Sequence, residues 1–208
     1  MLENKIRTPE ETEAYLRELK EWIHTQEETE AEEMSAFFTK RLARYEEVHL
    51  GNWGELYAHI ADFFDDGLET LLDIGCGTGL ELEAVYRRFP DAALSFETFH
   101  HFSYEKKGQI YEKLFQSLKN GGYYMECDYV ACCQEEEDLC MERLARARRR
   151  STLPEDVFLH IDTPLTLEHQ VELMERAGFR VRVLHQNEGT VVFRADKAET
   201  QRGKRGIL

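Results

Sequence analysis

The chain has few basic residues and no long apolar run, and each shortage excludes a class of function. It carries 26 lysines and arginines against 41 acidic residues, which gives a net charge of -15 over 208 residues. Nucleic-acid binding depends on clustered positive charge, so we expect no nucleic-acid partner. The N-terminus shows neither an apolar run near 18 residues nor a signal peptide. We therefore expect a cytoplasmic protein with no membrane partner.

The five cysteines lack the spacing of a familiar metal site. No C-x-x-C pair occurs, although Cys132 and Cys133 are adjacent. Such cysteines are usually small buried side chains in a protein of a reducing compartment. We predict no metal site and assign the adjacent pair no redox function.

The composition fits one compact unit with a helical extension. Hydrophobic residues make up 42% of the chain and aromatic residues 11%, which is enough to bury one good core. We divide the chain into a helical N-terminal cap at 1–66, an α/β core at 67–197 and a flexible basic tail at 198–208.

The most informative stretch is residues 70–80, TLLDIGCGTGL. It reads as a short buried strand followed by a glycine-rich turn and a helix, which we expect over residues 80–89. Gly75, Gly77 and Gly79 let the backbone turn sharply and expose its N–H groups. A ligand could then lie against the main chain at the positive end of the helix.

The spacing of these glycines helps to choose the ligand. Dinucleotide-binding folds use G-x-G-x-x-G, whereas this chain has G-x-G-x-G with Leu80 where the third glycine would stand. An acid at Asp73 is wrong for a pyrophosphate but suits a ligand with an ammonium group and a sulfonium. S-adenosylmethionine is such a ligand, and we expect Asp73 and the turn, Cys76 included, to contact it.

Helices and strands alternate along the rest of the chain. A helix begins after Thr8, which has Pro9 and Glu11 in capping-box positions. The residues 51–54, GNWG, read as a turn before a helix at 55–64. The expected strands lie at 92–96, 123–129, 179–184 and 190–195, and the expected helices at 105–119, 134–150 and, after an N-cap at Thr166, up to Ala177. The last two strands should form an antiparallel hairpin.

At this point the residues resemble class I S-adenosylmethionine-dependent methyltransferases, specifically small bacterial ones with a helical N-terminal cap. The segments that carry the likeness are 72–79 (LDIGCGTG), 94–101 (LSFETFHH), 118–122 (LKNGG) and 177–179 (AGF). The resemblance implies an α/β Rossmann-like three-layer sandwich with a mostly parallel sheet that ends in an antiparallel hairpin. It also implies that Tyr45, in the segment 45–50, lies over the methionine end of the cofactor.

One departure from that family is large. Between the first helix and the strand at 92–96, the family normally has a second strand that ends in an acid, then a helix and a third strand. About forty residues of this plan are missing here. Either the segment is truly absent, so that the sheet is reduced and Glu97 replaces the ribose-binding acid, or a segment is omitted from the sequence. A true deletion would expose a sheet edge and favour a homodimer.

The remaining site predictions concern the acceptor of the methyl group. His100 and His101 follow a strand end, where α/β sheets place ligands, and we predict them as catalytic bases. Glu126 and Asp128 alternate on the strand at 123–129 and are predicted to bind substrate. The predicted substrate contacts from the cap are His49 and Trp53.

The function predicted from these observations is S-adenosylmethionine-dependent methyl transfer to a small molecule. Two alternatives stay open: a degenerate, non-catalytic scaffold that associates through its sheet edge, and, less favoured by the glycine spacing, a nicotinamide-dependent oxidoreductase.

Overall fold

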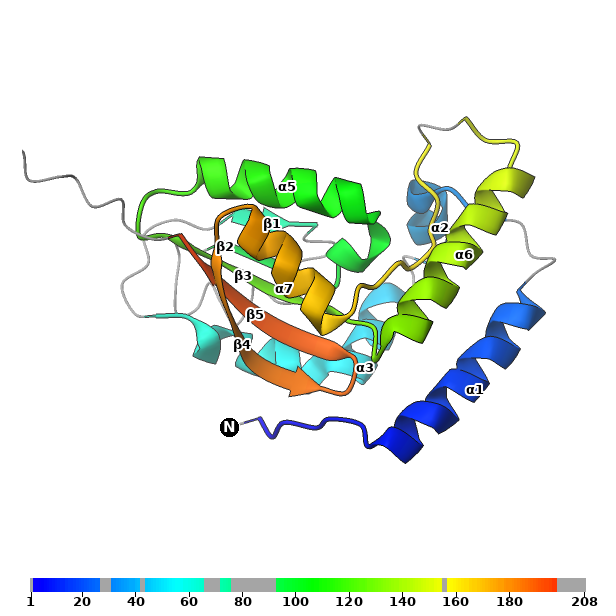
Figure 1. The fold of residues 1–208 in the computed structure, drawn as a ribbon, viewed down its shortest axis with the longest axis horizontal. Coiled ribbons are helices and arrows are strands. Elements are labelled where there is room, and N and C mark those ends of the chain that lie inside the picture. Colours follow the sequence, from blue (N-terminus) through cyan, green and yellow to red (C-terminus); the bar gives the residue numbers. More distant parts are fainter. Residues whose placement is uncertain are drawn as a thin grey trace, which may run out of the picture.

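A computed structural model describes residues 2–26, 31–41, 44–65, 72–75, 93–154 and 157–197. They form a five-stranded sheet with helices on both faces (Figure 1). The helix predicted at 80–89 and the tail predicted at 198–208 lie outside the described residues, as do Cys76, Gly77 and Gly79.

The sheet combines a parallel part with an antiparallel hairpin. Its strands are β1 (Leu72–Ile74), β2 (Ala93–Phe96), β3 (Tyr123–Tyr129), β4 (Arg180–Asn187) and β5 (Thr190–Asp196), in the order β1-β2-β3-β5-β4. The pairs β1–β2 and β2–β3 are parallel, and the pairs β3–β5 and β5–β4 are antiparallel. The predicted fold class, an α/β sheet that ends in an antiparallel hairpin, is confirmed.

Two helical layers cover the two faces of this sheet. Helix α3 (Tyr45–His59) and the 3-10 turn η2 (Ile60–Phe63) pack on one face, where Met125 and Cys127 of β3 point. Helices α5 (Tyr104–Ser117) and α7 (Leu167–Arg176) pack on the other face with Tyr124 of β3. Because successive strand residues point to opposite faces, β3 contributes to both cores.

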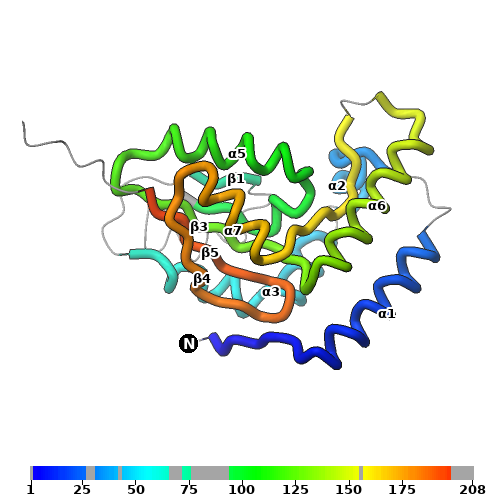
Figure 2. The backbone as a smooth tube through the Cα atoms, in the orientation of Figure 1, coloured from blue at the N-terminus to red at the C-terminus, as the bar shows by residue number. Residues whose placement is uncertain are grey.

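A group of helices extends beyond the carboxyl ends of the parallel strands. Helices α1 (Pro9–Thr25), α2 (Met34–Arg41) and α6 (Gln134–Arg150) lie together at this end of the molecule (Figures 1 and 2). The capping box predicted for α1 is present: the Glu11 N–H donates to Thr8 Oγ1, and the Thr8 N–H donates to the Glu11 carboxylate. The Tyr15 hydroxyl of α1 donates to Glu136 of α6 at 2.6 Å, which holds the two helices together.

The turn predicted at residues 51–54 is wrong, because α3 runs through both glycines without a break. Tyr45, His49 and Trp53 follow one another at four-residue intervals along this helix, and their rings stack in sequence. Together with the buried Leu56 on the sheet face, these contacts outweigh the weak helix preference of glycine.

Strand β1 lies at the edge of the sheet in the part of the chain that the structure describes. It pairs with β2 alone, and Leu72 is 52% exposed. This is the order expected if the second and third strands of the family plan are absent. The division of the chain at residue 66 stays a prediction, because α3 of the expected cap packs directly on the sheet.

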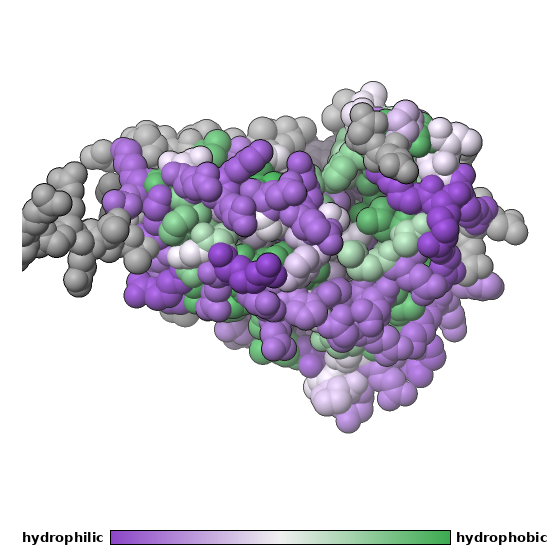
Figure 3. Space-filling view, turned by 45° about the horizontal axis from the view of Figure 1, so that its top comes forward, coloured by the Kyte–Doolittle hydropathy of each residue, from purple (hydrophilic) through white to green (hydrophobic). Residues whose placement is uncertain are grey.

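The surface agrees with the acidic composition. In Figure 3 the visible face is mostly hydrophilic, and hydrophobic side chains gather only in small separate patches. Each described helix is too short or too polar to cross a bilayer.

Candidate active site

The glycine turn and the end of β2 meet at the carboxyl edge of the sheet. Gly75 has a φ of +74°, a left-handed conformation that favours glycine. A Cβ atom at Gly75 would lie 2.5 Å from the side chain of Thr98, so the close approach of the two loops requires a glycine.

Asp73 is the middle residue of β1, two residues before Gly75, and both of its carboxylate oxygens are buried with no hydrogen-bond partner among the side chains that the structure describes. Burial raises the pKa of Asp73 to about 6. An unpaired, partly desolvated carboxylate is unfavourable, which makes this position a strong candidate for binding a cationic or hydrogen-bond-donating ligand.

Glu97 ends β2 in a strained conformation. Its φ of 47° is left-handed, which is uncommon for a residue with a side chain, and its backbone N–H donates to the Cys127 carbonyl at 2.7 Å. The strain turns the carboxylate into the interior, where Oε1 has no hydrogen-bond partner and Oε2 lies 3.8 Å from His100 Nδ1. Burial raises the pKa of Glu97 to about 8, in spite of the charge of His100.

His100 lies in the 3-10 turn η3 (Phe99–His101) and binds a carboxylate of the next strand. Its Nδ1–H donates to Asp128 Oδ1 at 2.6 Å, and both side chains are buried. Burial lowers the pKa of His100, but the charges of Asp128, Asp162 and Glu97 outweigh it and raise the pKa to about 9. This arrangement favours the cationic form of His100, and the catalytic role predicted for His100 stays a prediction.

His101 faces a second acid that the sequence did not single out. Its Nδ1 lies 3.0 Å from Asp162 Oδ1, and these two buried atoms make no well-oriented hydrogen bond. Burial and the charge of His100 lower the pKa of His101. His160 lies next to it, with ring centroids 5.0 Å apart, and burial together with the charge of His101 lowers its pKa to about 4. Of the three histidines, His101 and His160 favour the neutral form.

Hydrogen bonds of Thr163 hold the segment with His160 and Asp162 against η3 and α5. The buried Thr163 donates its N–H to the His100 carbonyl at 2.6 Å and its hydroxyl to the Phe102 carbonyl at 2.9 Å. The buried ammonium group of Lys107 donates to the Thr163 carbonyl at 3.1 Å. These bonds fix Asp162 beside the two histidines.

Aromatic side chains of α2 and α3 form a wall over this group of residues. Phe38 lies edge-on to Tyr45, to His101 and to His160, with ring centroids 5.4 to 6.2 Å apart. Tyr45 stacks on His49 at 4.0 Å, and His49 lies next to Trp53 at 5.1 Å. The predicted cap residues therefore lie in one row that reaches the histidines through Phe38.

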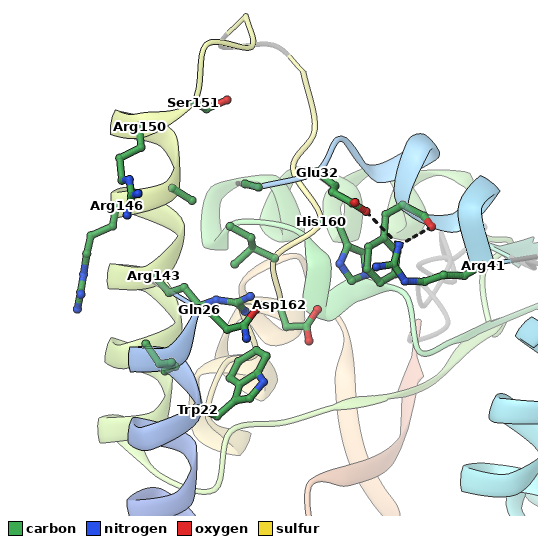
Figure 4. Close-up of a pocket in the computed structure, with 15 residues that line it drawn as sticks. Trp22, Gln26, Glu32, Arg41, Arg143, Arg146, Arg150, Ser151, His160 and Asp162 are labelled. Carbon is green, nitrogen blue, oxygen red and sulfur yellow. Dashed lines mark hydrogen bonds and ion pairs between the residues drawn. The ribbon is translucent and has the colours of Figure 1, made fainter. Parts of the chain in front are cut away.

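Two cavities open on the cluster and share Asp162. One of about 520 Å³ is lined by Trp53, Glu97, His100, the N-terminal stretch and the β4–β5 turn. The other, of about 730 Å³, lies between α1, α2 and α6 and is lined by His160 and by several arginines (Figure 4). Figure 4 shows Arg143 pointing toward Asp162, whereas Arg146 and Arg150 point away from it.

Glu126 lies apart from these cavities. It is fully buried and accepts hydrogen bonds from the Tyr111 hydroxyl at 2.9 Å, the Tyr124 hydroxyl at 2.9 Å and Gln170 Nε2 at 2.5 Å. These contacts tie β3 to α5 and α7. Its surroundings favour a structural role, so the expectation that Glu126 binds substrate has no support from its contacts.

The structure thus brings most of the predicted residues together and adds two. Gly75 contacts Thr98, the residue after Glu97, Asp73 lies opposite Leu94 on the neighbouring strand, and His100 and Asp128 form one hydrogen-bonded pair. Sequence reasoning missed His160 and Asp162. The signal available was an H-x-D triplet between two helices, just before the buried Thr163.

The described residues of this edge fit the amino-acid end of S-adenosylmethionine. Asp73 offers an unpaired carboxylate for its ammonium group, and the turn at Gly75 has no room for a side chain. The histidine cluster also contains metal-ligand types: His100, His101 and Asp162 form one set, and Glu97, His100 and Asp128 form another. The spacing of cysteines, on which the prediction of no metal rested, gave no information about these sets.

No protein-family profile and no curated protein sequence matches the chain. Solved structures do resemble it. The pyocyanin biosynthetic protein PhzM has a TM-score of 0.57 at 11% identity, over 80% of this chain and 62% of PhzM. Streptomyces venezuelae DesVI has a TM-score of 0.53 at 15% identity, over 75% of this chain and 97% of DesVI.

The mitomycin 7-O-methyltransferase MmcR has a TM-score of 0.51 at 14% identity, over 68% of this chain. This chain spans 53% of the length of MmcR. At these identities the likeness concerns the fold alone. The chain has the fold of class I S-adenosylmethionine-dependent methyltransferases.

Proposed function

We propose that this protein transfers a methyl group from S-adenosylmethionine to a small-molecule nucleophile. The observation that carries the proposal is the carboxylate of Asp73 in β1, which is partly desolvated and accepts no hydrogen bond from another side chain among the described residues. A carboxylate beside a left-handed glycine turn suits an ammonium group and disfavours a pyrophosphate. The fold shared with known methyltransferases supports the same assignment.

The chain's own residues would do three things in this reaction. When bound, S-adenosylmethionine supplies an electrophilic methyl group on a sulfonium. Asp73 and the turn at Gly75 hold the amino-acid end, and Glu97, at the neighbouring strand end, is our candidate for the ribose. The aromatic row that begins at Tyr45 excludes water from the site, which an in-line displacement requires.

The acceptor must lose a proton if it is a hydroxyl or an amine, and the histidine cluster is where we place this step. His101 and His160 favour the neutral form and can accept a proton, whereas His100 is held as a cation by Asp128. We therefore refine the predicted catalytic role: His101 and its neighbour His160 face the acceptor, and His100 positions them.

The larger cavity suggests the chemical class of the acceptor. Among the described residues, the half-buried Arg143 has no carboxylate within ion-pair distance, and its guanidinium lies over the Trp22 ring at 4.5 Å. Arg41 lies over the Phe37 ring at 3.5 Å across the same cavity. A planar acceptor with a negative charge would gain both a ring contact and a charge-assisted hydrogen bond here.

Calorimetric titration separates this function from its alternatives. We expect S-adenosylhomocysteine to bind with one site per chain and NADH not to bind. Binding of NADH alone would support the oxidoreductase. If neither ligand binds, the result would support a non-catalytic scaffold and would refute the proposal.

The acceptor class is tested on the complex with S-adenosylhomocysteine. We expect a hydroxybenzoate to bind more tightly than its neutral methyl ester, and Arg143→Gln to remove the difference. Arg149→Gln, on the same helix and outside the cavity lining, is the matched control. Equal binding of the acid and the ester to the wild-type complex would refute the anionic class while leaving the cofactor assignment intact.

A further inference from the structure

The histidine cluster has more ligand atoms than its own hydrogen bonds use. Glu97 Oε1, Asp128 Oδ2, His101 Nδ1 and Asp162 Oδ1 are all buried without a hydrogen-bond partner. Buried polar atoms in folded proteins are nearly always satisfied, so four such atoms in one small volume need an explanation. An ion between His101 Nδ1 and Asp162 Oδ1 is one for two of them, because it would satisfy both atoms at once.

We propose that His100, His101 and Asp162 bind a divalent transition-metal ion through His100 Nε2, His101 Nδ1 and Asp162 Oδ1. This is the ligand set of two histidines and one carboxylate, which leaves coordination positions open for a substrate. The proposal rests on the proposed function only for the role of the ion, and the site itself stands on the geometry of the three residues.

The distances between the three atoms suit one ion. His101 Nδ1 and Asp162 Oδ1 are 3.0 Å apart, and His100 Nε2 and Asp162 Oδ1 are 3.9 Å apart. All three atoms lie within 4.8 Å of one another. Ligands about 2.1 Å from an ion stand about 3.0 to 3.4 Å apart in octahedral or tetrahedral geometry. The two distances to Asp162 therefore need a change of less than an ångström to match such a site.

A second carboxylate orients one of the ligands. The Nδ1–H of His100 donates to Asp128 at 2.6 Å, which directs Nε2 of the same ring toward Asp162. A metal-binding histidine usually donates its other N–H to a carboxylate or a carbonyl in this way. The alternative set of Glu97, His100 and Asp128 would need the same Nδ1 atom as a ligand and would break this bond, so we prefer the first set.

The electrostatics of the cluster favour a positive charge at this place. The carboxylate oxygens of Asp128, Glu97 and Asp162 lie 2.6, 3.8 and 3.9 Å from the ring nitrogens of His100. A metal ion bound at Nε2 would be attracted by these three carboxylates. The open side of Asp162 faces both cavities, so an ion there would be reachable from solvent.

Such an ion would give the proposed methyl transfer a way to activate the acceptor hydroxyl. A hydroxyl of the acceptor that binds the metal becomes more acidic, because the ion stabilises the oxygen anion. The O–H bond would then break with the electron pair left on oxygen, and the proton would pass to the solvent that reaches Asp162 through the cavities. The oxygen next forms its bond to the methyl carbon as the bond from that carbon to sulfur breaks.

Cobalt(II) titration of the full-length chain after treatment with a chelator tests the site. We expect one Co²⁺ per chain, visible ligand-field bands without a thiolate charge-transfer band, and displacement by Zn²⁺. His101→Gln and Asp162→Asn should each lower the affinity at least tenfold. Asp128→Asn should lower it about 10- to 100-fold and shift the ligand-field bands, as expected for a residue that orients a ligand.

Two controls keep the outcome interpretable. His169→Gln removes a histidine of α7 that pairs with Glu137 outside the cluster and should bind Co²⁺ like the wild type. Cys132→Ser tests for a thiol site. Circular dichroism shows whether each variant folds, and the part-exposed Asp162 makes Asp162→Asn the variant least dependent on the core.

The proposal is overturned if the wild type binds no Co²⁺, if a thiolate band appears and Cys132→Ser removes it, or if folded Asp162→Asn binds as tightly as the wild type. Titration of S-adenosylhomocysteine into the metal-free protein separates the two proposals. Cofactor binding without Co²⁺ binding would refute the metal site alone, and the reverse would refute the proposed function alone.

Discussion

Replacement of Asp73 by asparagine tests the cofactor assignment through affinity, pH dependence and stability together. Asparagine keeps the size of the side chain and removes its charge. A hydrogen bond between a carboxylate and an ammonium group contributes about 1.5 to 3 kcal/mol. We therefore expect Asp73→Asn to raise the Kd for S-adenosylhomocysteine about 10- to 150-fold.

The pH dependence follows from the direction of the pKa shift. Burial raises the pKa of Asp73 to about 6, so the carboxylate of the free protein is mostly charged at pH 7 and mostly neutral at pH 5. Affinity of the wild type for S-adenosylhomocysteine should fall about tenfold from pH 7 to pH 5. The asparagine variant should bind weakly and without this step.

Stability should change in the opposite direction. A carboxyl group whose folded pKa is raised favours the folded state only when protonated, so the wild type loses stability as the pH rises from about 4 through 6. The rise from 3.8 to about 6 is about two pKa units, or about 3 kcal/mol, and the partial exposure of the side chain reduces the effect to about 1 to 2 kcal/mol. At pH 7, ligand-free Asp73→Asn should be more stable than the wild type by about this amount.

Calorimetry at pH 5, 6 and 7 and urea denaturation of the ligand-free proteins measure both effects. Asp138→Asn is the matched control, since Asp138 is an exposed acid of α6 far along the chain from the turn. A variant that binds S-adenosylhomocysteine as tightly as the wild type, or one that is destabilised without its ligand, would refute the reasoning.

Three further predictions concern the stability and assembly of the fold around the site. Gly51→Ala should raise the free energy of unfolding by about 0.5 to 1 kcal/mol, because this helical position has open space for a Cβ. Gly178→Ala should lower the free energy of unfolding, because φ is +110° and the Cβ would meet the Phe115 ring at 2.8 Å; urea denaturation measures both, and equal effects would contradict the backbone argument. Burial raises the pKa of Glu126 to about 8, so the wild type should lose stability between about pH 4.5 and pH 8, by at most about 1.4 kcal/mol per pH unit. Glu126→Gln should have a flatter dependence of the unfolding free energy on pH, and the same dependence in both proteins would contradict the prediction. The exposed edge of β1 should pair with a second chain, so the wild type should sediment as a dimer and Leu72→Lys as a monomer; a monomeric wild type would contradict this.

The fold could be predicted from local signals wherever one signal decides the structure. The N-caps at Thr8 and Thr166 mark the starts of α1 and α7, and the residues 123–129 form β3 as expected. The glycines at 51 and 54 mislead because their weak helix preference is small against the packing of α3 on the sheet. Such packing joins residues far apart in sequence, and no local pattern reports it.

The residues of the site also divide into those that a local sequence signal locates and those that only the packing of the fold brings together. Asp73 lies near the end of β1, and Glu97 and His100 lie one and four residues after β2, so the rule that ligands bind at the carboxyl ends of parallel strands locates them. Asp162 reaches the same place only because Thr163 bonds to the carbonyl of His100, 63 residues away in sequence. The H-x-D triplet carries no periodic signal, so its role becomes visible only once the connection between α6 and α7 is placed in three dimensions.

The reduced sheet gives these observations a common cause. In the family plan a separate strand brings an acid to the ribose, but here β1 lies at the edge and the next strand in space is β2. Glu97 then stands nearest to the glycine turn, and its left-handed φ of 47° turns it inward rather than along the strand. A fold that holds Glu97 strained and Asp73 unpaired gives up stability at both strand ends. Among the described residues the carboxylate of Asp73 accepts no side-chain hydrogen bond and that of Glu97 has one ion-pair contact, with His100 at 3.8 Å, so binding of a ligand is the physical reason for both that we favour.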